Sequence, residues 1–265
     1  MKAKKALGQN FLKSQLALRK IIEAGEIKES DTVLEIGPGR GALTEKLLEK
    51  SQHVIAVEKD RELYEFLKIK FAKETESRSF VLVHGDILEF KVESYKVKSY
   101  KVIANIPYNI TGAILKKFLT GSPPAGGQPE AMILMVQNEV AKRIIGRENN
   151  KIKESILSIS VKAYGEPRIV MKVPRRYFSP APKVDSAVIA IKNISRKKLV
   201  HLAGQPIFNE ERFWEIVKMG FAHKRKKLGS NLKSIMEPEK LQNGLFYDKR
   251  AEDLTLLDWI ALAKI

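Results

Sequence analysis

The feature that most constrains the fold is a series of five short apolar segments, most of them followed by a glycine-containing or polar turn and a helical pattern. Each segment has the length and composition of a buried strand, and stretches such as ALTEKLLEK and RELYEFLKIKFAK show helical spacing of apolar residues. Such strands alternating with helices are typical of a parallel sheet covered on both faces. We therefore expect an α/β fold with a Rossmann-like sheet, whose strands cover residues 31–36, 53–58, 80–83, 101–104 and 131–136.

The pattern changes after a further apolar strand, SAVIAI. Beyond Lys192 the chain shows separate helical segments, FNEERFWEIVKMGF and RAEDLTLLDWIALAKI. We expect one larger domain over residues 1–194 and a small helical domain over residues 195–265.

In open α/β sheets the ligand lies beyond the carboxyl ends of the strands. The residues found there are Gly37, Glu58, Asp86 and Asn105. Glycines 37, 39 and 41 allow a tight turn and a close approach of the backbone to a ligand. The turn, followed by Ala42, also satisfies the loose dinucleotide fingerprint, so a nicotinamide-dependent dehydrogenase is one hypothesis.

Glu35 favours a different cofactor. A carboxylate just before the glycine turn repels a pyrophosphate but attracts the ammonium end of a methionine moiety, so the pattern fits S-adenosylmethionine, with S-adenosylhomocysteine as product. Glu58 is then expected to accept hydrogen bonds from the ribose hydroxyls, or else to be a surface acid paired with Lys59 or Arg61. Asp86 is expected to accept from the adenine amine while the Ile87 amide donates to the ring; the alternative for Asp86 is a capping residue.

Asn105, Ile106, Pro107 and Tyr108 follow the fourth strand. An exocyclic adenine amine is a weak nucleophile because its lone pair is delocalised into the ring. The Asn105 oxygen and the Ile106 carbonyl offer two acceptors for the amine hydrogens, Pro107 fixes the turn, and Tyr108 offers a face for an extruded base. Such positioning supplies most of the rate without a strict need for a general base. The alternative is an ordinary Asn-x-Pro turn.

A proline-stiffened loop, FSPAPKVD, precedes the last apolar strand. Phe178 is expected to sandwich the adenine from the side opposite Tyr108, or to be a core aromatic residue. Lys183 is expected to contact phosphate or to be solvated.

The formal net charge of +17 favours a polyanionic partner. The excess of Lys and Arg is spread along the chain: 14 basic residues face 9 acidic ones from Arg196 onward. The densest basic cluster is expected to bind RNA, although charge runs are often only solvated, and Arg143, Arg147, Arg175 and Arg176 are expected to extend it. The cluster comprises Lys218, His223, Lys224, Arg225, Lys226, Lys227 and Lys233.

Other features narrow the class of protein. No apolar run reaches the roughly 20 residues that span a bilayer, and the chain has no cysteine. The basic start resembles a presequence, but a motif beginning at Gly8 leaves no room for a removable leader. We expect a cytoplasmic protein with no metal and no membrane association, and nothing in the sequence demands a dimer.

Taken together, these motifs resemble those of the small-subunit type of rRNA adenine N6,N6-dimethyltransferases along almost the whole chain. The resemblance rests on LGQNFL from Leu7, EIGPGRGALT from Glu35, VEKD from Val57, GDI from Gly85, NIPYNIT from Asn105 and FSPAPKVDSAV from Phe178. HKRKKLGSNLK and RAEDLTLLDWIALA resemble the C-terminal helical domain of that family.

The resemblance implies that Asn10 and Leu12 contact the cofactor and close over it, and that Asn105 lies near both cofactor and adenine. It also implies dimethylation of two adjacent adenosines near the 3′ end of 16S rRNA, in a pre-assembled small subunit, with a role in subunit assembly. Ile106 and the KRKK run depart from the commoner family pattern, and the second weakens any expectation of base-specific contacts there.

Two alternatives stay open within this class. The sibling family that dimethylates large-subunit rRNA shares NIPY but differs in its opening and late loop. The other is a methyltransferase-like protein that binds RNA or DNA and has lost catalysis or uses it little; substitution of Asn105 distinguishes this alternative.

Overall fold

The computed structural model describes residues 3–4, 7–95, 97, 99–120, 127–146, 152–204, 208–237 and 246–265. It divides into two compact units, each described by itself below. The first comprises Met1–Ala141 and Glu166–Ile194, and the second comprises Lys142–Gly165 and Ser195–Ile265. The boundary after Ile194 coincides with the expected one, whereas the segment Lys142–Gly165 belongs to the second unit rather than to the first.

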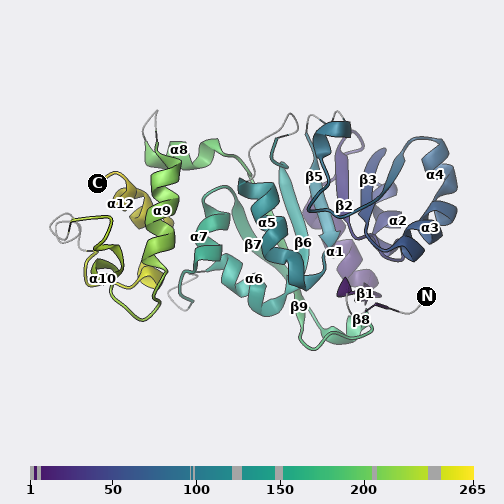
Figure 1. Ribbon diagram of the computed structural model, residues 1–265. Helices are drawn as coiled ribbons and strands as arrows, with labels where there is room; N and C mark the ends of the chain where they lie inside the picture. The colour runs from purple at the N-terminus through teal and green to yellow at the C-terminus, as the bar shows by residue number, and fades with distance from the viewer. Residues whose placement is uncertain are drawn as a thin grey trace. The chain divides into compact units, whose positions relative to one another are not determined.

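The first unit is built on a seven-stranded sheet in the order β4-β3-β2-β5-β6-β9-β7 (Figure 1). The first five strands of that order are parallel, and β9 and β7 are antiparallel to their neighbours. The strands are β2 (Thr32–Ile36), β3 (His53–Glu58), β4 (Phe80–His84), β5 (Lys101–Asn105), β6 (Ala131–Gln137), β7 (Glu166–Val173) and β9 (Ser186–Lys192).

The expected strands and the Rossmann-like class are confirmed, but the sheet is mixed rather than purely parallel. The sequence did not predict β7, because EPRIVMKV lacks a continuous apolar run. In the structure most of its residues are exposed or half-buried. It is an edge strand that pairs with β9 through an irregularity between Ile169 and Met171. A separate two-stranded sheet joins β1 (Phe11–Leu12) to β8 (Phe178–Ser179).

Helices cover both faces of the large sheet, which explains why β5, β6 and β9 are buried at nearly every position. α1 packs on β5, β6, β7 and β9, and Figure 1 shows α5 in front of the sheet. The helices and 3-10 turns of this unit are α1 (Gln15–Gly25), α2 (Ala42–Leu48), α3 (Arg61–Lys70), α4 (Ala72–Glu76), η2 (Val92–Tyr95), η3 (Tyr108–Ile110), α5 (Thr111–Thr120), η4 (Arg175–Tyr177) and the start of α6 (Asn138–Ile145).

The second unit is helical in its described part. Its core holds Phe213 and Trp259, both without exposed surface, and α9 approaches α12 so closely that a Cβ at Gly220 would lie 2.4 Å from the Trp259 ring. Its elements are α7 (Ile156–Lys162), α8 (Lys197–Ala203), α9 (Glu210–Gly220), α10 (Leu228–Leu232), η5 (Ala251–Asp253) and α12 (Leu256–Ala263).

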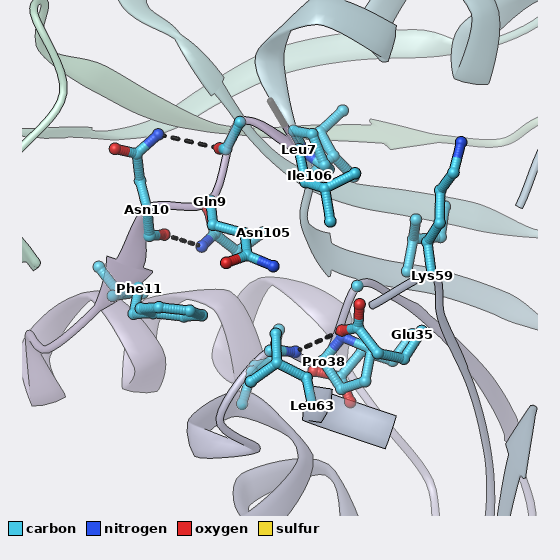
Figure 2. Close-up of a pocket in the computed structure, with 18 of the residues that line it drawn as sticks. Leu7, Gln9, Asn10, Phe11, Glu35, Pro38, Lys59, Leu63, Asn105 and Ile106 are labelled. Carbon is cyan, nitrogen blue, oxygen red and sulfur yellow. Dashed lines mark hydrogen bonds between the residues drawn. The ribbon is translucent and has the colours of Figure 1, made fainter. Parts of the chain in front are cut away.

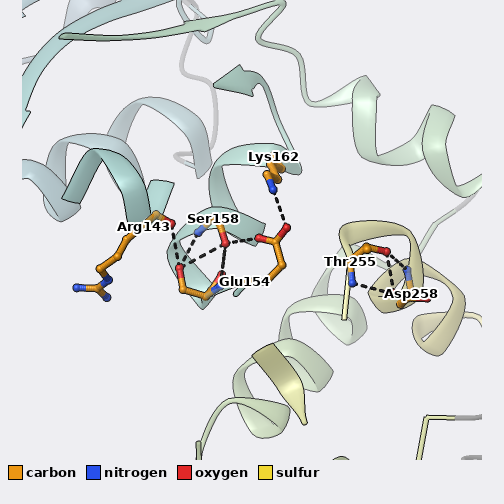
Figure 3. A network of polar contacts seen from close by, with 7 residues as sticks. Arg143, Glu154, Ser158, Lys162, Thr255 and Asp258 are labelled. Carbon is orange, nitrogen blue, oxygen red and sulfur yellow. Dashed lines mark hydrogen bonds and ion pairs between the residues drawn. The ribbon is translucent and has the colours of Figure 1, made fainter. Parts of the chain in front are cut away.

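Glu154 explains why residues 142–165 belong to this second unit. Its buried carboxylate accepts hydrogen bonds from the Ser158 hydroxyl and, at 2.6 Å, from Lys162 Nζ (Figure 3). Its backbone amide donates to the Glu252 carbonyl at 2.9 Å, which attaches the start of α7 to η5. The expected domain range lacked this segment because the contact joins residues about a hundred positions apart.

Candidate functional site

A cavity of about 360 Å³ opens at the carboxyl ends of β2, β3 and β5, beside the N-terminal segment (residues 7–13). It is the edge of the sheet where the sequence predicted a ligand. Among the predicted site residues, those that line this cavity are Asn10, Leu12, Gly37, Gly39, Glu58, Asp86, Ile87, Asn105, Ile106, Pro107 and Tyr108.

The glycine turn after β2 forms one wall of the cavity. Gly37 and Gly39 have φ values of 64° and 61°, a region that favours glycine over residues with a side chain. A Cβ at Gly37 would meet no atom within 4 Å, so the backbone there faces open space in the cavity. A Cβ at Gly39 would lie 3.1 Å from the Phe11 ring. The turn therefore presents bare backbone to a ligand and is covered by Phe11.

Glu35 lies beneath the turn and is 1% exposed. Burial raises the pKa of its carboxyl to about 8, although the hydrogen bond that it accepts from Thr44 Oγ1 at 2.7 Å acts to lower it. No cation is paired with it among the described residues. A buried acid held only by a hydroxyl donor is therefore largely protonated at neutral pH, and a cation bound beside it would favour its ionised form.

Glu58 is also buried, at 5% exposure, so it is not the surface acid of the alternative interpretation. Its two oxygens accept from backbone amides, Oε2 from Gly39 at 3.1 Å and Oε1 from Asp60 at 2.8 Å. Burial raises the pKa of this carboxyl despite those hydrogen bonds. The carboxylate is held in a fixed orientation at the pocket wall, as an acceptor for hydroxyl groups requires.

Asp86 also lines the pocket, but unlike Glu58 it is paired with a lysine. Lys59 Nζ lies 2.7 Å from Oδ2, and the Leu88 amide donates to Oδ1 at 2.9 Å. The Lys59 hydrogen bond lowers the pKa of this carboxyl, with a further contribution from the Leu88 amide. Asp86 therefore opens the turn at residues 87–89, a local role close to the alternative interpretation, and it still borders the cavity together with the buried Ile87.

Asn105 is oriented by the N-terminal segment. Its Nδ2 donates to the Asn10 carbonyl at 3.0 Å, and the Asn10 side chain donates to the Gly8 carbonyl at 3.1 Å (Figure 2). Since the amide nitrogen is occupied by a backbone acceptor, the Asn105 oxygen is the end left to accept hydrogens from a ligand. This contact fixes the orientation that an adenine amine would need.

The turn after Asn105 is equally constrained. Pro107 has φ −60° and ψ 130°, which is the extended conformation that precedes η3. The Tyr108 hydroxyl lies 2.5 Å from the Ser186 hydroxyl, and burial raises the pKa of the phenol. Ser186 is fully buried at the start of β9. The Tyr108 ring at the pocket is thus fixed at its far end.

The structure places Phe178 away from the position expected for it. Its side chain is 2% exposed in the core cluster with Leu12, and it is not among the residues that line the cavity. The reason is the β1–β8 register, which pairs Phe178 with Leu12 and leaves Ser179 at the cavity. Phe178 is thus a core aromatic residue, which was the alternative that the sequence left open for it.

The predicted RNA-binding residues are exposed. Lys183 lies in the loop between β8 and β9 of the first unit, Lys218 in α9 and Lys233 just after α10. The other five are consecutive in the exposed turn between α9 and α10, where Lys227 pairs with Asp248 at 2.7 Å. Of the four arginines expected to extend the surface, Arg175 and Arg176 are exposed in η4, Arg143 lies in α6, and Arg147 lies outside the described residues.

Several contacting residues were missed from the sequence. Phe11 lines the cavity with Arg40 4.6 Å above its ring, Gln9 and Asp60 hold the N-terminal segment, and Ser186 anchors Tyr108. The position of Gln9 and Phe11 within LGQNFL was a usable signal. Asp60 and Ser186 gave none, because their partners lie far away in the sequence.

Within the described ranges, no cluster of three or more potential metal ligands occurs. Nor does any helix of that part of the chain have the length and apolar character needed to cross a membrane.

A family model and curated relatives match this chain along nearly its whole length. The family model described as ribosomal RNA adenine dimethylase matches residues 1–265. The chain is 38% identical to ribosomal RNA small subunit methyltransferase A of Nostoc punctiforme, covering 99% of this chain and 94% of that protein. It is 40% identical to the protein of the same name from Dehalococcoides mccartyi, covering 98% and 87% of the two chains.

Solved structures agree on the fold. A dimethyladenosine transferase from Plasmodium falciparum matches with a TM-score of 0.77 and 26% identity over 95% of each chain. The 23S rRNA methyltransferase ErmE matches with a TM-score of 0.75 and 24% identity over 96% and 98% of the two chains.

Proposed function

We propose that this chain, which belongs to the ribosomal RNA adenine dimethylase family, transfers methyl groups from S-adenosylmethionine to the N6 amines of two adjacent adenosines near the 3′ end of 16S rRNA. The observation that carries the proposal is the orientation of Asn105. Its amide nitrogen is bound to the Asn10 carbonyl, so its oxygen is available to an adenine amine.

The pocket residues fit S-adenosylmethionine, which supplies an electrophilic methyl group on a sulfonium when bound. Glu35 and Glu58 are buried carboxylates without a cationic partner among the described residues, and the ligand carries positive charge. Glu58 would accept from the ribose hydroxyls, Asp86 and Ile87 would border the adenine, and the bare backbone at Gly37 and Gly39 would admit close contact. Asn10 and Leu12 would close the pocket.

At the reacting end, the chain's own groups position the target amine. The Asn105 oxygen and the Ile106 carbonyl accept its two hydrogens, which draws electron density onto the nitrogen and favours a pyramidal geometry. The Tyr108 ring, anchored through Ser186, stacks against the extruded base. Once methylated, the nitrogen is acidic and releases a proton to water, so no side chain has to act as a strong base.

We further propose that the second unit binds RNA through the exposed basic turn at residues 223–227, with Lys218 and Lys233 adding phosphate contacts, and that Lys183 of the first unit contacts phosphate as well. The substrate is a pre-assembled small ribosomal subunit, the protein acts as a monomer in the cytoplasm, and its binding contributes to subunit assembly. The names of the relatives from Nostoc punctiforme and Dehalococcoides mccartyi support the small subunit over the large one. The dinucleotide-dependent alternative is not retained, because the family and the buried Glu35 both argue against it.

The test is incubation of the protein with labelled S-adenosylmethionine and, in separate reactions, undermethylated small subunits and large-subunit RNA, followed by nucleoside analysis of the RNA. Dimethyladenosine in small-subunit rRNA is the expected result. Label only in large-subunit RNA would favour the sibling activity, and binding of RNA without any label would favour a binding-only role.

A further inference from the structure

Asp60 lies outside the cavity lining but connects two parts of the site. It is 3% exposed, lies two residues after the end of β3, and caps the start of α3 by accepting from the Glu62 amide at 3.0 Å. Its own backbone amide donates to Glu58 Oε1 at 2.8 Å. A helix cap needs only one side-chain oxygen, so the second oxygen of Asp60 is available for another purpose.

That second oxygen binds the N-terminal segment. Asp60 Oδ2 accepts from Gln9 Nε2 at 2.7 Å, and Oδ1 also accepts from Lys4 Nζ at 2.8 Å. Gln9 Oε1 in turn accepts from the Lys4 amide at 2.8 Å. Although burial opposes ionisation, the hydrogen bonds from Lys4 and Gln9 lower the pKa of the Asp60 carboxyl, so it is charged at neutral pH. Lys4, Gln9 and Asp60 therefore form one closed set of contacts, in which Lys4 takes part through both its side chain and its backbone amide.

The next residue along the segment is Asn10, whose carbonyl accepts from Asn105 Nδ2. Figure 2 shows Gln9 and Asn10 beside Asn105 at the pocket wall. The contacts thus run without a break from Glu58 through the Asp60 amide, the Asp60 carboxylate and Gln9 to Asn10 and Asn105.

From these contacts we infer that Asp60 is a positioning residue. It fixes the N-terminal segment against Glu58, and through the Asn10 carbonyl it orients the Asn105 amide for the adenine amine. This inference rests on the proposed function. It implies that the Asp60 carboxylate links Glu58, on the cofactor side of the pocket, to Asn105, on the side where the adenine amine would react.

The substitution Asp60→Asn tests this selectively. It keeps one oxygen for the Glu62 amide and Lys4, but it places an NH2 group against Gln9 Nε2, so two donors face each other. Gln9→Ala removes the same contact from the other side without touching the helix cap. The double variant D60N/Q9E restores the contact with donor and acceptor exchanged, because the carboxylate introduced at position 9 can accept both from the amide introduced at position 60 and from the Lys4 backbone amide.

The experiment compares kcat, KM for RNA, the dissociation constant for S-adenosylhomocysteine and Tm across these variants. D60N and Q9A are each expected to lower kcat roughly tenfold or more, with a smaller change in KM for RNA. The D60N/Q9A double variant should be no worse than the poorer single variant, and D60N/Q9E should recover most of kcat.

Asp31 provides the matched control. Its carboxylate also accepts from a lysine, Lys101 at 2.7 Å, and from a backbone amide, that of Lys28 at 2.8 Å, but it does not line the pocket. D31N should lower Tm with kcat unchanged. If D60N does not fold, Q9A carries the test alone.

The inference is overturned if D60N and Q9A keep kcat within twofold of the unsubstituted protein, or if D60N/Q9E is no better than D60N. Absence of methyl transfer by the unsubstituted protein would instead count against the proposed function.

Discussion

The pocket of the first unit contains buried acidic side chains, whereas the turn at residues 223–227 of the second unit carries exposed basic ones. In the pocket, Glu35 and Glu58 are buried and their donors are a hydroxyl and backbone amides. In the turn, Lys224, Arg225 and Lys226 are exposed and form no ion pair with any residue that the structure describes. Buried acids without a cation select one small cationic ligand, whereas exposed cations favour a long polyanion and tolerate variation in it.

The largest expected effect is that of a substitution at the reacting centre, which changes neither the buried acids nor the basic turn. Asn105→Ala is such a substitution, because it removes a neutral acceptor. We expect kcat to fall by about 10² to 10³, the loss typical of removing one preorganised hydrogen-bonding group at a reacting centre. Binding of RNA, measured by filter binding, should change by less than about threefold, and binding of S-adenosylhomocysteine, measured by calorimetry, should weaken far less than kcat falls, because Asn105 also holds the Asn10 carbonyl at the pocket. Equal loss of binding and turnover would contradict the role given to Asn105.

The second effect tests the basic turn. Replacing Lys224, Arg225 and Lys226 with Ala is expected to weaken RNA binding roughly 30-fold at low salt and to reduce the slope of log K against log salt by about 2. Replacing Lys50, Lys68 and Lys73, which are exposed in or near α2, α3 and α4, removes the same net charge and serves as the control. If both triple variants lose affinity equally, the turn is only part of a diffuse positive field and the comparison between the two regions fails.

The third effect tests the buried acids through pH. Without ligand, the pKa of Glu35 is about 8 in the folded chain and near its ordinary value in the unfolded chain. Between these two pH values Glu35 is protonated in the folded chain and ionised in the unfolded chain. Stability should therefore fall as pH rises from about 5 to 8, and Glu35→Gln should flatten much of that fall in a Tm series. The raised pKa of Glu58 acts in the same direction and leaves a residual slope.

Ligand binding should show the reverse dependence. A cationic ligand favours the ionised form of Glu35, so affinity for S-adenosylmethionine should rise with pH up to about 8. Glu35→Gln should weaken binding roughly tenfold at pH 8.5 and much less at pH 6.5, as measured by calorimetry at each pH. Affinity independent of pH in the unsubstituted protein would mean that the buried acid does not interact with the ligand's charge.

The sequence predicted the acidic pocket better than it predicted the contacts that orient it. Gly37, Glu58 and Asp86 each lie at or just beyond the carboxyl end of an apolar strand, and parallel strands bring those ends together, so the pattern itself located the pocket. The hydrogen bond from Asn105 to Asn10 joins residues 95 positions apart, and no local pattern encodes it. Phe178 was uncertain for the same reason, because the β1–β8 register decides which way its ring points.

The smallest expected effect concerns a contact that belongs to neither charge pattern. Ser186→Ala leaves the half-buried Tyr108 hydroxyl without its partner, and Tyr108→Phe removes the same contact from the other side. Each should lower kcat/KM about threefold, since the ring stays in place but is less firmly held, and the double variant should lose no more than either single one. Tyr108→Ala removes the stacking face and should cost at least tenfold more. Additive losses in the double variant would show that Ser186 acts on the site by a route other than Tyr108, and the neutral anchor would then have to be sought elsewhere along β9.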